Sequence, residues 1–466
     1  MTLSRRLDMK NVMCGLRKTV KWLLTVFASL FVFMLVLWVV LPDEDLTGEV
    51  VQILKDPPRV PAKHNAFYVF WGFEADPSLD AHSVGMRMDE ALEQARAQQK
   101  SIAYDDLQRF LGTSPVNIDR SDKCFYQAGT NSLAQVRAAR AKIEASERKF
   151  QPYIKRYQSL RSFANFKEPV PRSVDEPILS YAGLVMVSGL VDARIALDMA
   201  DKPKQGAALE NLAAELRLWR KIGQESQTLI TKMVATKVLQ RKFLLVADLL
   251  AESPDIAVNM PELLSEITRP LAANEITLER ALVGEFRWVS GTFLGLRSDI
   301  DAAPYSASNV LNKLILARGF KPNATVNLSF VKNKELRDFY NRPAAAIAAN
   351  ESAFIAEWGR FSPYSPSTLF YNPVGKVLVY VSPPDYGTYV YRMHDLDAFS
   401  RLLELQRQLS VVQLSADKVA DFVQQANASL RDPYTGKPMR WNAAARTLSM
   451  QGHGKDGDKL SVRLSF

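Results

Sequence analysis

The chain has 466 residues, of which 47% are apolar and 23% are charged, the proportions of an ordinary globular protein. Its formal net charge is +9, but residues 1–42 contribute +5 of this charge, from six basic residues and one acidic residue. The other 53 basic and 49 acidic residues are mixed along the rest of the chain, without a long basic run that would follow a phosphate backbone. We therefore expect no nucleic-acid partner.

An apolar stretch over residues 22–41 is the first element in the chain. Its twenty residues include no charged residue, glycine or proline, and as a helix they would span about 30 Å, the thickness of a bilayer's hydrocarbon core. Trp22 and Trp38 lie near its ends, where indole rings favour the headgroup boundary. The stretch is long for a signal peptide, and no small-residue cleavage site follows it. It predicts an uncleaved transmembrane helix, whose partner is the lipid bilayer.

The charges on the two sides of this stretch differ. Residues 1–21 form a basic tail, whereas Asp43, Glu44 and Asp45 follow the stretch, so the tail is predicted to be cytoplasmic and the rest exported. Cys14 and Cys124 would then lie on opposite sides of the membrane and form no disulfide with each other. Such cysteine poverty favours a bacterial periplasm. We predict a single-pass inner-membrane protein with most of its chain in the periplasm.

The predicted stalk that follows covers residues 42–66. Pro57, Pro58 and Pro61 favour a stiff, extended spacer. The aromatic cluster over residues 66–73 is too short to span a membrane, and it is either a buried strand or the beginning of the first helix. A helix over residues 84–99 follows it.

Residues 67–300 are predicted to form a helical periplasmic domain. Apolar residues recur every seven from Val136 to Tyr157, but Pro152 interrupts the run and the matching earlier positions are Ala139 and Ser146, not large apolar residues. This pattern indicates a helix pair or a kinked helix rather than a long coiled coil. Residues 173–176 read Ser-Val-Asp-Glu, a capping box that would begin a helix over residues 178–199. The uncharged part of this helix is too short to span a membrane, so we expect the helix to be buried in the protein.

Three apolar stripes at helical spacing follow in the same domain. They consist of Leu209, Leu212, Leu216 and Trp219; of Leu229, Met233, Val238, Val246 and Leu249; and of Leu278, Leu282, Phe286, Val289, Phe293 and Leu296. The last stripe is the most regular, with Leu282 and Phe286 at its centre, and both are expected to be buried. Helices with short, proline-marked links predict an all-α bundle or helical array.

The amino-acid composition changes after residue 300. Residues 301–394 are rich in Pro, Asn, Ser and Tyr and are predicted to be an irregular connecting region with short strands, one of them at residues 376–381. Residues 395–466 are predicted to be a small α+β module, with helices over 396–409 and 416–430 and strands over 439–441, 447–451 and 459–466. Before its first strand, Gly436 is expected at positive φ and Asp432 is expected to brace the turn through backbone amides. The predicted fold class is thus mainly α.

The catalytic motifs of known enzyme families are present only in part. Ser415 and Lys418 match the Ser-x-x-Lys of penicillin-recognising enzymes, but the pattern occurs twice more and no Lys-Thr-Gly follows it. Glu351 with Ser352 matches the Glu-Ser of lytic transglycosylases, without the Gly-Leu-Met-Gln expected downstream. Glu275 and Glu279 are expected one turn apart on a polar helix face, rather than as an acid–base pair. We predict no catalytic residue.

Metal-binding residues are also scattered. The four histidines, His64, His82, His394 and His453, have no ligand spacing. Asp432, Asp456 and Asp458 would supply oxygen ligands to calcium if their turns met, but the spacing of an EF-hand loop is missing and a solvated turn is favoured. We predict no metal site and no cofactor.

Two functions fit this sequence. The preferred one is a membrane-anchored periplasmic protein that binds or scaffolds other proteins of the bacterial cell envelope. The alternative is a membrane-tethered envelope hydrolase, acting on peptidoglycan or another glycan, whose site has no recognisable motif. A cleft with paired, pKa-shifted carboxylates would favour the hydrolase, and an apolar groove or exposed patch would favour the binding protein.

Overall fold

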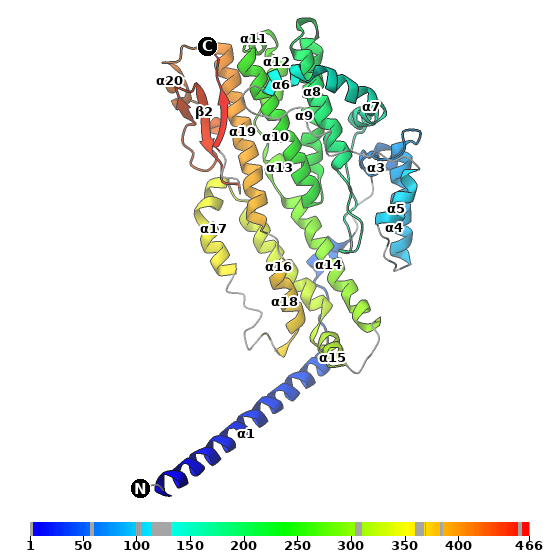
Figure 1. Ribbon diagram of the computed structural model, residues 1–466, viewed down its shortest axis with the longest axis vertical. Helices are drawn as coiled ribbons and strands as arrows, with labels where there is room; N and C mark the ends of the chain where they lie inside the picture. Colours follow the sequence, from blue (N-terminus) through cyan, green and yellow to red (C-terminus); the bar gives the residue numbers. More distant parts are fainter. Residues whose placement is uncertain are drawn as a thin grey trace. The chain divides into compact units, whose positions relative to one another are not determined.

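The computed structural model describes residues 3–55, 60–98, 100, 102, 104–112, 132–302, 310–358, 368, 370–382, 385–454 and 459–465. These residues are mainly helical, with one small three-stranded sheet near the C-terminus (Figure 1). The chain divides into two compact units. One, which we call the α1 unit, comprises Met1–Lys55, Ser290–Lys332 and Ala353–Pro384; the other, the bundle unit, comprises Asp56–Val289, Asn333–Ser352 and Asp385–Phe466. Each unit therefore draws on separate stretches of chain, unlike the linear series of domains predicted from the sequence.

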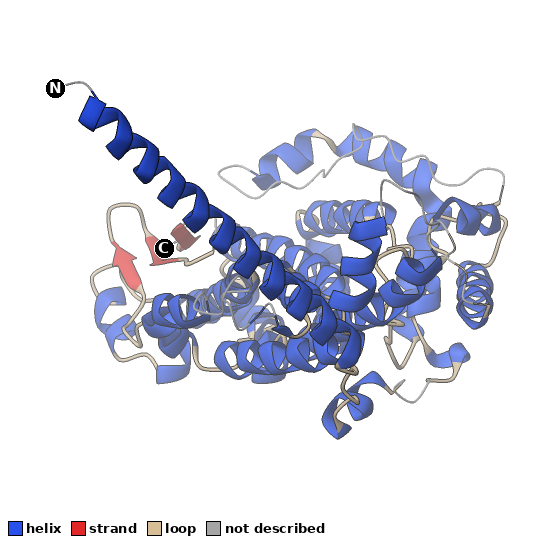
Figure 2. Cartoon of the chain, turned by 90° about the horizontal axis from the view of Figure 1, so that it is seen from below, coloured by secondary structure: helices blue, strands red, loops and turns tan. Residues whose placement is uncertain are grey.

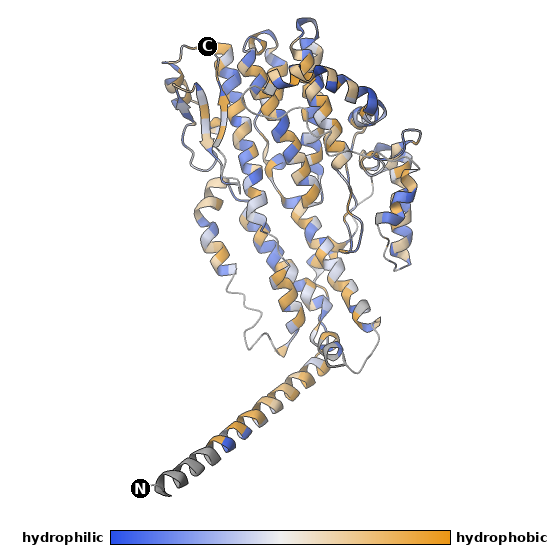
Figure 3. Ribbon diagram, in the orientation of Figure 1, coloured by the Kyte–Doolittle hydropathy of each residue, from blue (hydrophilic) through white to orange (hydrophobic). Residues whose placement is uncertain are grey.

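The α1 unit begins with the helix α1, Leu3–Val40. Figure 3 shows the apolar character of the C-terminal half of this helix. Its segment Leu16–Val40 is the one described helix that is long and apolar enough to cross a membrane, and only 6% of its most apolar window is buried. The apolar helix predicted at residues 22–41 is thus present, with its side chains turned outward.

The end of α1 is packed against protein. Trp38 is 6% exposed and lies against Gly319, so its indole is covered by protein. Residues 42–55 are not the extended stalk that the prolines predicted, because they bond to helix α16 and include the helix α2, Gly48–Leu54, with Val50 fully buried. Residues 56–59 lie outside the described part of the chain.

The other described residues of the α1 unit are mainly helical, where an irregular region with strands was predicted. It contains α15 (Val310–Gly319), α18 (Pro373–Val381) and parts of α14 (Glu279–Ala302), α16 (Pro322–Tyr340) and α17 (Ala344–Trp358). The strand predicted at residues 376–381 is wrong. Asn372 starts α18 instead, because its side-chain oxygen accepts a hydrogen bond from Gly375 N, and Pro373 has the backbone angle that a first helical residue requires.

The bundle unit opens with two closely packed helices, α3 (Phe67–Trp71) and α4 (Ala81–Ala97). The aromatic cluster at residues 66–73 is therefore the beginning of a helix and not a strand. A Cβ atom at Gly85 would lie 1.9 Å from the carbonyl oxygen of Tyr68, so only glycine permits this approach of α4 to α3. The short α5, Tyr104–Gln108, follows.

The centre of the bundle unit consists of longer helices. They are α6 (Ser132–Ala138), α7 (Arg140–Ser159), α8 (Ala182–Met199), α9 (Gln205–Glu225) and α10 (Leu229–Glu252). The seven-residue pattern belongs to the pair α6 and α7, with Pro152 inside α7, and its apolar positions are buried. The helix α8 is buried on most sides, as its composition predicted. The stripe of Leu209 to Trp219 also faces the core.

The most regular apolar stripe lies on α14, as predicted. Leu282 and Phe286 are both buried, whereas Val289 and Leu296 are half-buried. Glu275 and Glu279, however, do not share a helix. Glu275 lies in α13, Ala273–Ile276, and Thr277 ends that helix and accepts a hydrogen bond from Glu279 N at the start of α14. The short α11 (Ile256–Asn259) and α12 (Pro261–Thr268) precede them.

The three strands predicted near the C-terminus are present, whereas the helices before them have different bounds from those predicted. The helices α19 (Tyr386–Val412) and α20 (Val419–Gln424) precede an antiparallel sheet in the order β1 (Arg440–Asn442), β2 (Thr447–Gln451) and β3 (Lys459–Arg463), drawn in red in Figure 2. Gly436 has φ 66°, and Asp432 accepts hydrogen bonds from Tyr434 N and from the Thr435 hydroxyl. The expected turn is confirmed. Single turns of 3-10 helix occur at Ala62–His64, Arg109–Leu111, Leu160–Ser162, Lys202–Lys204 and Ala428–Leu430.

Candidate functional site

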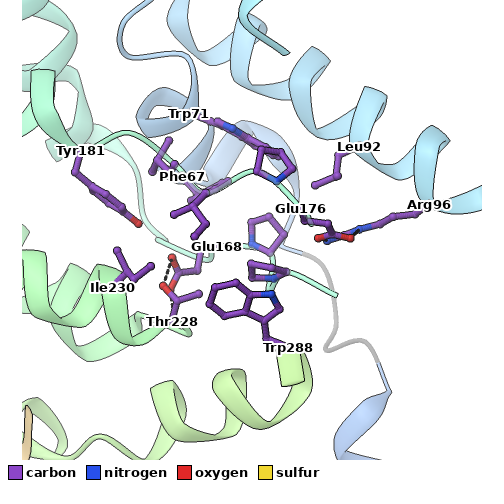
Figure 4. A pocket seen from close by; sticks show the side chains of 15 residues that line it. Phe67, Trp71, Leu92, Arg96, Glu168, Glu176, Tyr181, Thr228, Ile230 and Trp288 are labelled. Atoms are coloured by element: carbon purple, nitrogen blue, oxygen red, sulfur yellow. Dashed lines mark hydrogen bonds and ion pairs between the residues drawn. The ribbon is translucent and has the colours of Figure 1, made fainter. Parts of the chain in front are cut away.

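A pocket in the bundle unit is a candidate functional site (Figure 4). It holds about 50 Å³ of space for water-sized groups and is lined by side chains from α3, α4, the N-terminus of α10, Trp288 of α14 and a non-helical segment. That segment, residues 163–181, we call the strap. Pockets that are largely apolar with a few convergent polar groups are the usual form of small binding sites.

The strap is extended because of its prolines. Pro169, Pro171 and Pro177 cannot donate backbone hydrogen bonds, and each disfavours helix in the residue before it. The capping box predicted at residues 173–176 is therefore wrong: Pro177 follows Glu176 directly, and α8 begins only at Ala182. Asn65 fastens the strap, since its side chain donates to Lys167 O and accepts from Lys167 N, both at 2.8 Å.

Glu168 is the polar centre of the pocket. Its side chain is buried, with the residue 4% exposed, and its carboxylate accepts hydrogen bonds from the backbone amides of Gln227 and Thr228 at 2.5 and 2.6 Å. These amides begin α10, where a negative charge is favoured by the helix dipole. Burial nevertheless raises the pKa of Glu168 to about 7, because the hydrogen bonds only partly offset the loss of hydration.

A series of hydroxyl groups ends at this carboxylate. The hydroxyl of Thr231 contacts both Glu168 and the phenol of Tyr181. Because a threonine hydroxyl carries a single proton, Thr231 donates to Glu168 and accepts from Tyr181. Burial, together with the neighbouring Glu168, raises the pKa of Tyr181, so this phenol keeps its proton. The carboxylate and the two hydroxyls thus have their partners within the protein.

The other side of the pocket holds an ion pair. Arg96 donates to both carboxylate oxygens of Glu176, at 2.8 and 2.5 Å, and also to Glu93 at 2.6 Å. Figure 4 shows this pair opposite the group formed by Tyr181, Glu168 and Thr228. Glu176 accepts a further hydrogen bond from Arg172 N, so the pair closes the end of the strap onto α4.

Apolar side chains are exposed to solvent between these two polar groups. Ile178 is 45% exposed and Ile230 is 36% exposed, and both line the pocket. The carboxylates of Glu168 and Glu176 already accept hydrogen bonds from protein groups, whereas the exposed surface of the two isoleucines is available to a ligand. The arrangement is suited to binding an apolar group, and poorly suited to acid–base chemistry, which needs a carboxylate that can reach the substrate.

The residues singled out by the sequence motifs lie elsewhere. Ser415 and Lys418 are exposed in a turn, and Glu351 accepts hydrogen bonds from the hydroxyls of Tyr340 and Tyr391 at 3.2 and 2.6 Å. Glu275 is buried between Arg220 and Arg269, with nearest approaches of 3.2 and 2.8 Å. None of them joins the pocket.

The described residues contain no group of three or more metal-binding side chains. Two histidines, His394 and His453, contact the ring of Tyr434, and His82 stacks on Phe163. Asp432 braces its own turn, while Asp456 and Asp458 lie outside the described residues. The calcium hypothesis is therefore not tested.

Sequence reasoning missed a buried ionic cluster between α8, α9 and α10. Lys242 is fully buried, and its ammonium group donates to Asp192 at 2.5 Å and to Glu215 at 2.7 Å. Arg241 and Arg161 bind the remaining oxygens of the two carboxylates. A signal was present, because Lys242 lies one helical turn from both Val238 and Val246 on the apolar stripe of α10.

The chain matches no protein-family model, and no similar curated protein or solved structure was found.

Proposed function

We propose that this protein is a single-pass, membrane-anchored binding protein of the bacterial cell envelope. Its basic N-terminal tail lies in the cytoplasm, α1 spans the inner membrane and the remaining chain lies in the periplasm. The observation that carries this proposal is the segment Leu16–Val40, whose apolar side chains are largely exposed and which has basic residues before it and acidic residues after it.

The binding role is supported by the pocket. Its carboxylates are already engaged, Glu168 by the N-terminus of α10 and Glu176 by Arg96, while Ile178 and Ile230 remain exposed. An apolar side chain from another envelope protein would cover the two isoleucines without leaving a buried polar group unpaired. The partner proposed is thus a protein that presents an apolar segment.

Cysteine labelling in intact cells tests the topology. The substitution Ala444→Cys is made at an exposed position in the turn between β1 and β2, in a chain that also carries Cys124→Ser, and a membrane-impermeant maleimide is added. We expect the cysteine introduced at position 444 to be labelled in intact cells and the native Cys14 to be labelled only after lysis. Labelling of Cys14 alone in intact cells would reverse the proposed orientation.

Photo-crosslinking tests the binding role. A photoreactive amino acid is placed at Ile230 and, as the matched control, at Lys237, which is exposed on the same helix. Crosslinked products of defined mass are expected at residue 230 and not at residue 237. Equal patterns at the two positions would show that the pocket is not the binding surface.

A membrane-tethered envelope hydrolase is the second candidate. It is favoured by one observation, the burial of Glu168 in a pocket with a pKa of about 7, a value suited to a general acid. The solubilised protein and its Glu168→Gln variant are incubated with isolated peptidoglycan, and soluble fragments are measured. Release by the unmodified protein alone would support the hydrolase, and release by neither supports the binding protein.

A further inference from the structure

The structure holds the outer end of α1 in a protein collar. The collar consists of residues 316–323 and 370–373, and it contacts α1 within the α1 unit. The ammonium group of Lys321 donates to Trp38 O at 3.0 Å and to Leu41 O at 2.6 Å. These carbonyls lie at the C-terminal end of α1, where a cation is favoured by the helix dipole.

Further contacts join the collar to the end of α1 and the residues after it. Trp38 is buried against Gly319, and the hydroxyl of Tyr371 donates to Pro42 O. Asp43, three residues after the end of α1, accepts hydrogen bonds from Asn323 N and Ala324 N at the start of α16, at 2.9 and 3.0 Å. The depth of the collar in the membrane is therefore fixed by the depth of Trp38.

Helix geometry gives that depth. The last basic residue before the apolar stretch is Lys21, so the hydrocarbon begins near Trp22. From Trp22 to Trp38 a helix rises about 24 Å, which is about 6 Å less than the hydrocarbon thickness. Any tilt of α1 reduces the rise along the membrane normal and places Trp38 deeper.

Apolar side chains of the collar are exposed at this level. Leu316, one turn before Gly319 on α15, is 41% exposed, and Phe370, next to Tyr371, is 36% exposed. On α1 itself, Val39 and Val40 are more than half exposed. These residues continue the lipid-facing surface of α1 onto the collar, so the bilayer is the occupant that accounts for their exposure.

We propose that the collar is a second membrane-contact surface, in which Leu316 and Phe370 insert into the headgroup and upper acyl region of the bilayer that α1 spans. This inference rests on the proposed membrane anchor. The collar then acts as a stop that sets the depth of the α1 unit, in addition to the anchoring by α1. Side chains of this kind add affinity for the interface through the apolar area they bury.

Fluorescence quenching in reconstituted vesicles tests the proposal. The full chain, with Cys14→Ser and Cys124→Ser, receives a single cysteine by Leu316→Cys, Phe370→Cys, Phe27→Cys or Ala444→Cys, and each variant is labelled with a small environment-sensitive fluorophore. The labelled proteins are reconstituted in phosphatidylcholine–phosphatidylglycerol vesicles. The quencher is a nitroxide on the lipid acyl chain, near either the headgroup or the chain end.

The expected pattern separates the anchor from the collar. The label at residue 27, about 7.5 Å beyond Trp22 along α1, reports the anchor and should be quenched by both acyl-chain nitroxides. Labels at residues 316 and 370 should lose at least half of their emission to the headgroup-proximal nitroxide, while the label at residue 444 keeps its emission. Quenching at residue 27 without quenching at residues 316 and 370 would overturn the collar proposal and leave the anchor standing. Absence of quenching at residue 27 would overturn both.

Discussion

At the scale of single residues, the buried ionic cluster around Lys242 is the least expected feature of the bundle unit. Burial alone would raise the pKa of Glu215, but Lys242 and Arg161 outweigh this effect and hold the pKa below its usual value. The carboxylate therefore stays charged in the core, and its stability there depends on the cations beside it.

Removing the central cation should be costly. Lys242→Ala leaves Asp192 and Glu215 buried with one arginine each, and we expect a loss of about 3 kcal/mol in the free energy of unfolding. The exposed Lys237 on the same helix provides the control, and Lys237→Ala should change stability by less than about 0.5 kcal/mol. Thermal melts of the detergent-solubilised chain make the comparison, and similar shifts for the two variants would contradict the structural role of the cluster.

Two other buried groups predict how stability depends on pH. Glu168 has a pKa of about 7 in the folded protein against an ordinary 4.5, so between these values the folded state retains a proton that the unfolded state has lost. Its contribution is therefore present below pH 4.5 and is lost as the pH rises to 7. Burial lowers the pKa of Lys232 from 10.5 to about 7, and its contribution is present above pH 10.5 and is lost as the pH falls to 7.

The two contributions should be separable by substitution. In melts between pH 4.5 and 10.5, Glu168→Gln should flatten the decline of stability on the acid side, and Lys232→Met should flatten the rise on the alkaline side. The ammonium group of Lys232 donates to Gly223 O and Glu275 O, so the methionine will also lower stability at every pH. The quantity to compare is the slope of the free energy of unfolding against pH. Unchanged slopes in both variants would refute the assignment of these pH effects to Glu168 and Lys232.

At the scale of secondary-structure elements, α14 has a well-defined buried face. Phe286→Ala removes a buried ring and should cost about 3–5 kcal/mol. Glu279, with a side chain 41% exposed, pairs with Arg337 at 3.1 Å, and Glu279→Ala should cost no more than about 1 kcal/mol. Equal shifts in melting temperature for the two variants would show that the face of α14 has been misassigned.

The sequence predicted elements well where one local pattern decides the structure. Examples are the stripes on α9 and α14, the seven-residue pattern of α6 and α7, and the strands that follow Gly436. It failed at residues 376–381, where β-branched residues suggested a strand but the cap by Asn372 and its contact with Thr325 favour helix. It also missed the pocket, because Glu168 meets Thr228 and Thr231 only through the fold, about sixty residues away in the chain.

At the scale of the whole molecule, the junction after α1 joins distant parts of the chain. The carboxylate of Asp43 caps α16 across some 280 residues, as an N-cap residue of the helix itself normally would. No local sequence pattern marks such a contact, and this is why the segment resembled a stalk. The two-unit organisation, with each unit built from several stretches, escapes sequence reasoning for the same reason.

Asp43→Ala should weaken this junction by about 1 kcal/mol, the usual effect of losing an N-cap. Asp45, an exposed acidic residue two positions further on, is the matched control, since Asp45→Ala changes the charge after α1 equally. Amide hydrogen exchange at the start of α16 should become faster in the first variant and not in the second. Faster exchange in both would indicate a general charge effect instead of a lost cap.

The contacts between α1 and the collar can form only late in the synthesis of the chain. As a ribosome delivers the chain from its N-terminus, α1 emerges before the collar that will hold Trp38, Leu41 and Asp43 has been synthesised. The α1 unit can close only after residues 290–332 and 353–384 have followed. A fragment trimmed before residue 43 to obtain a soluble protein would lack Trp38, uncover Gly319 and leave Lys321 without the carbonyls it binds. Such a fragment would expose a surface that the complete chain never presents to water.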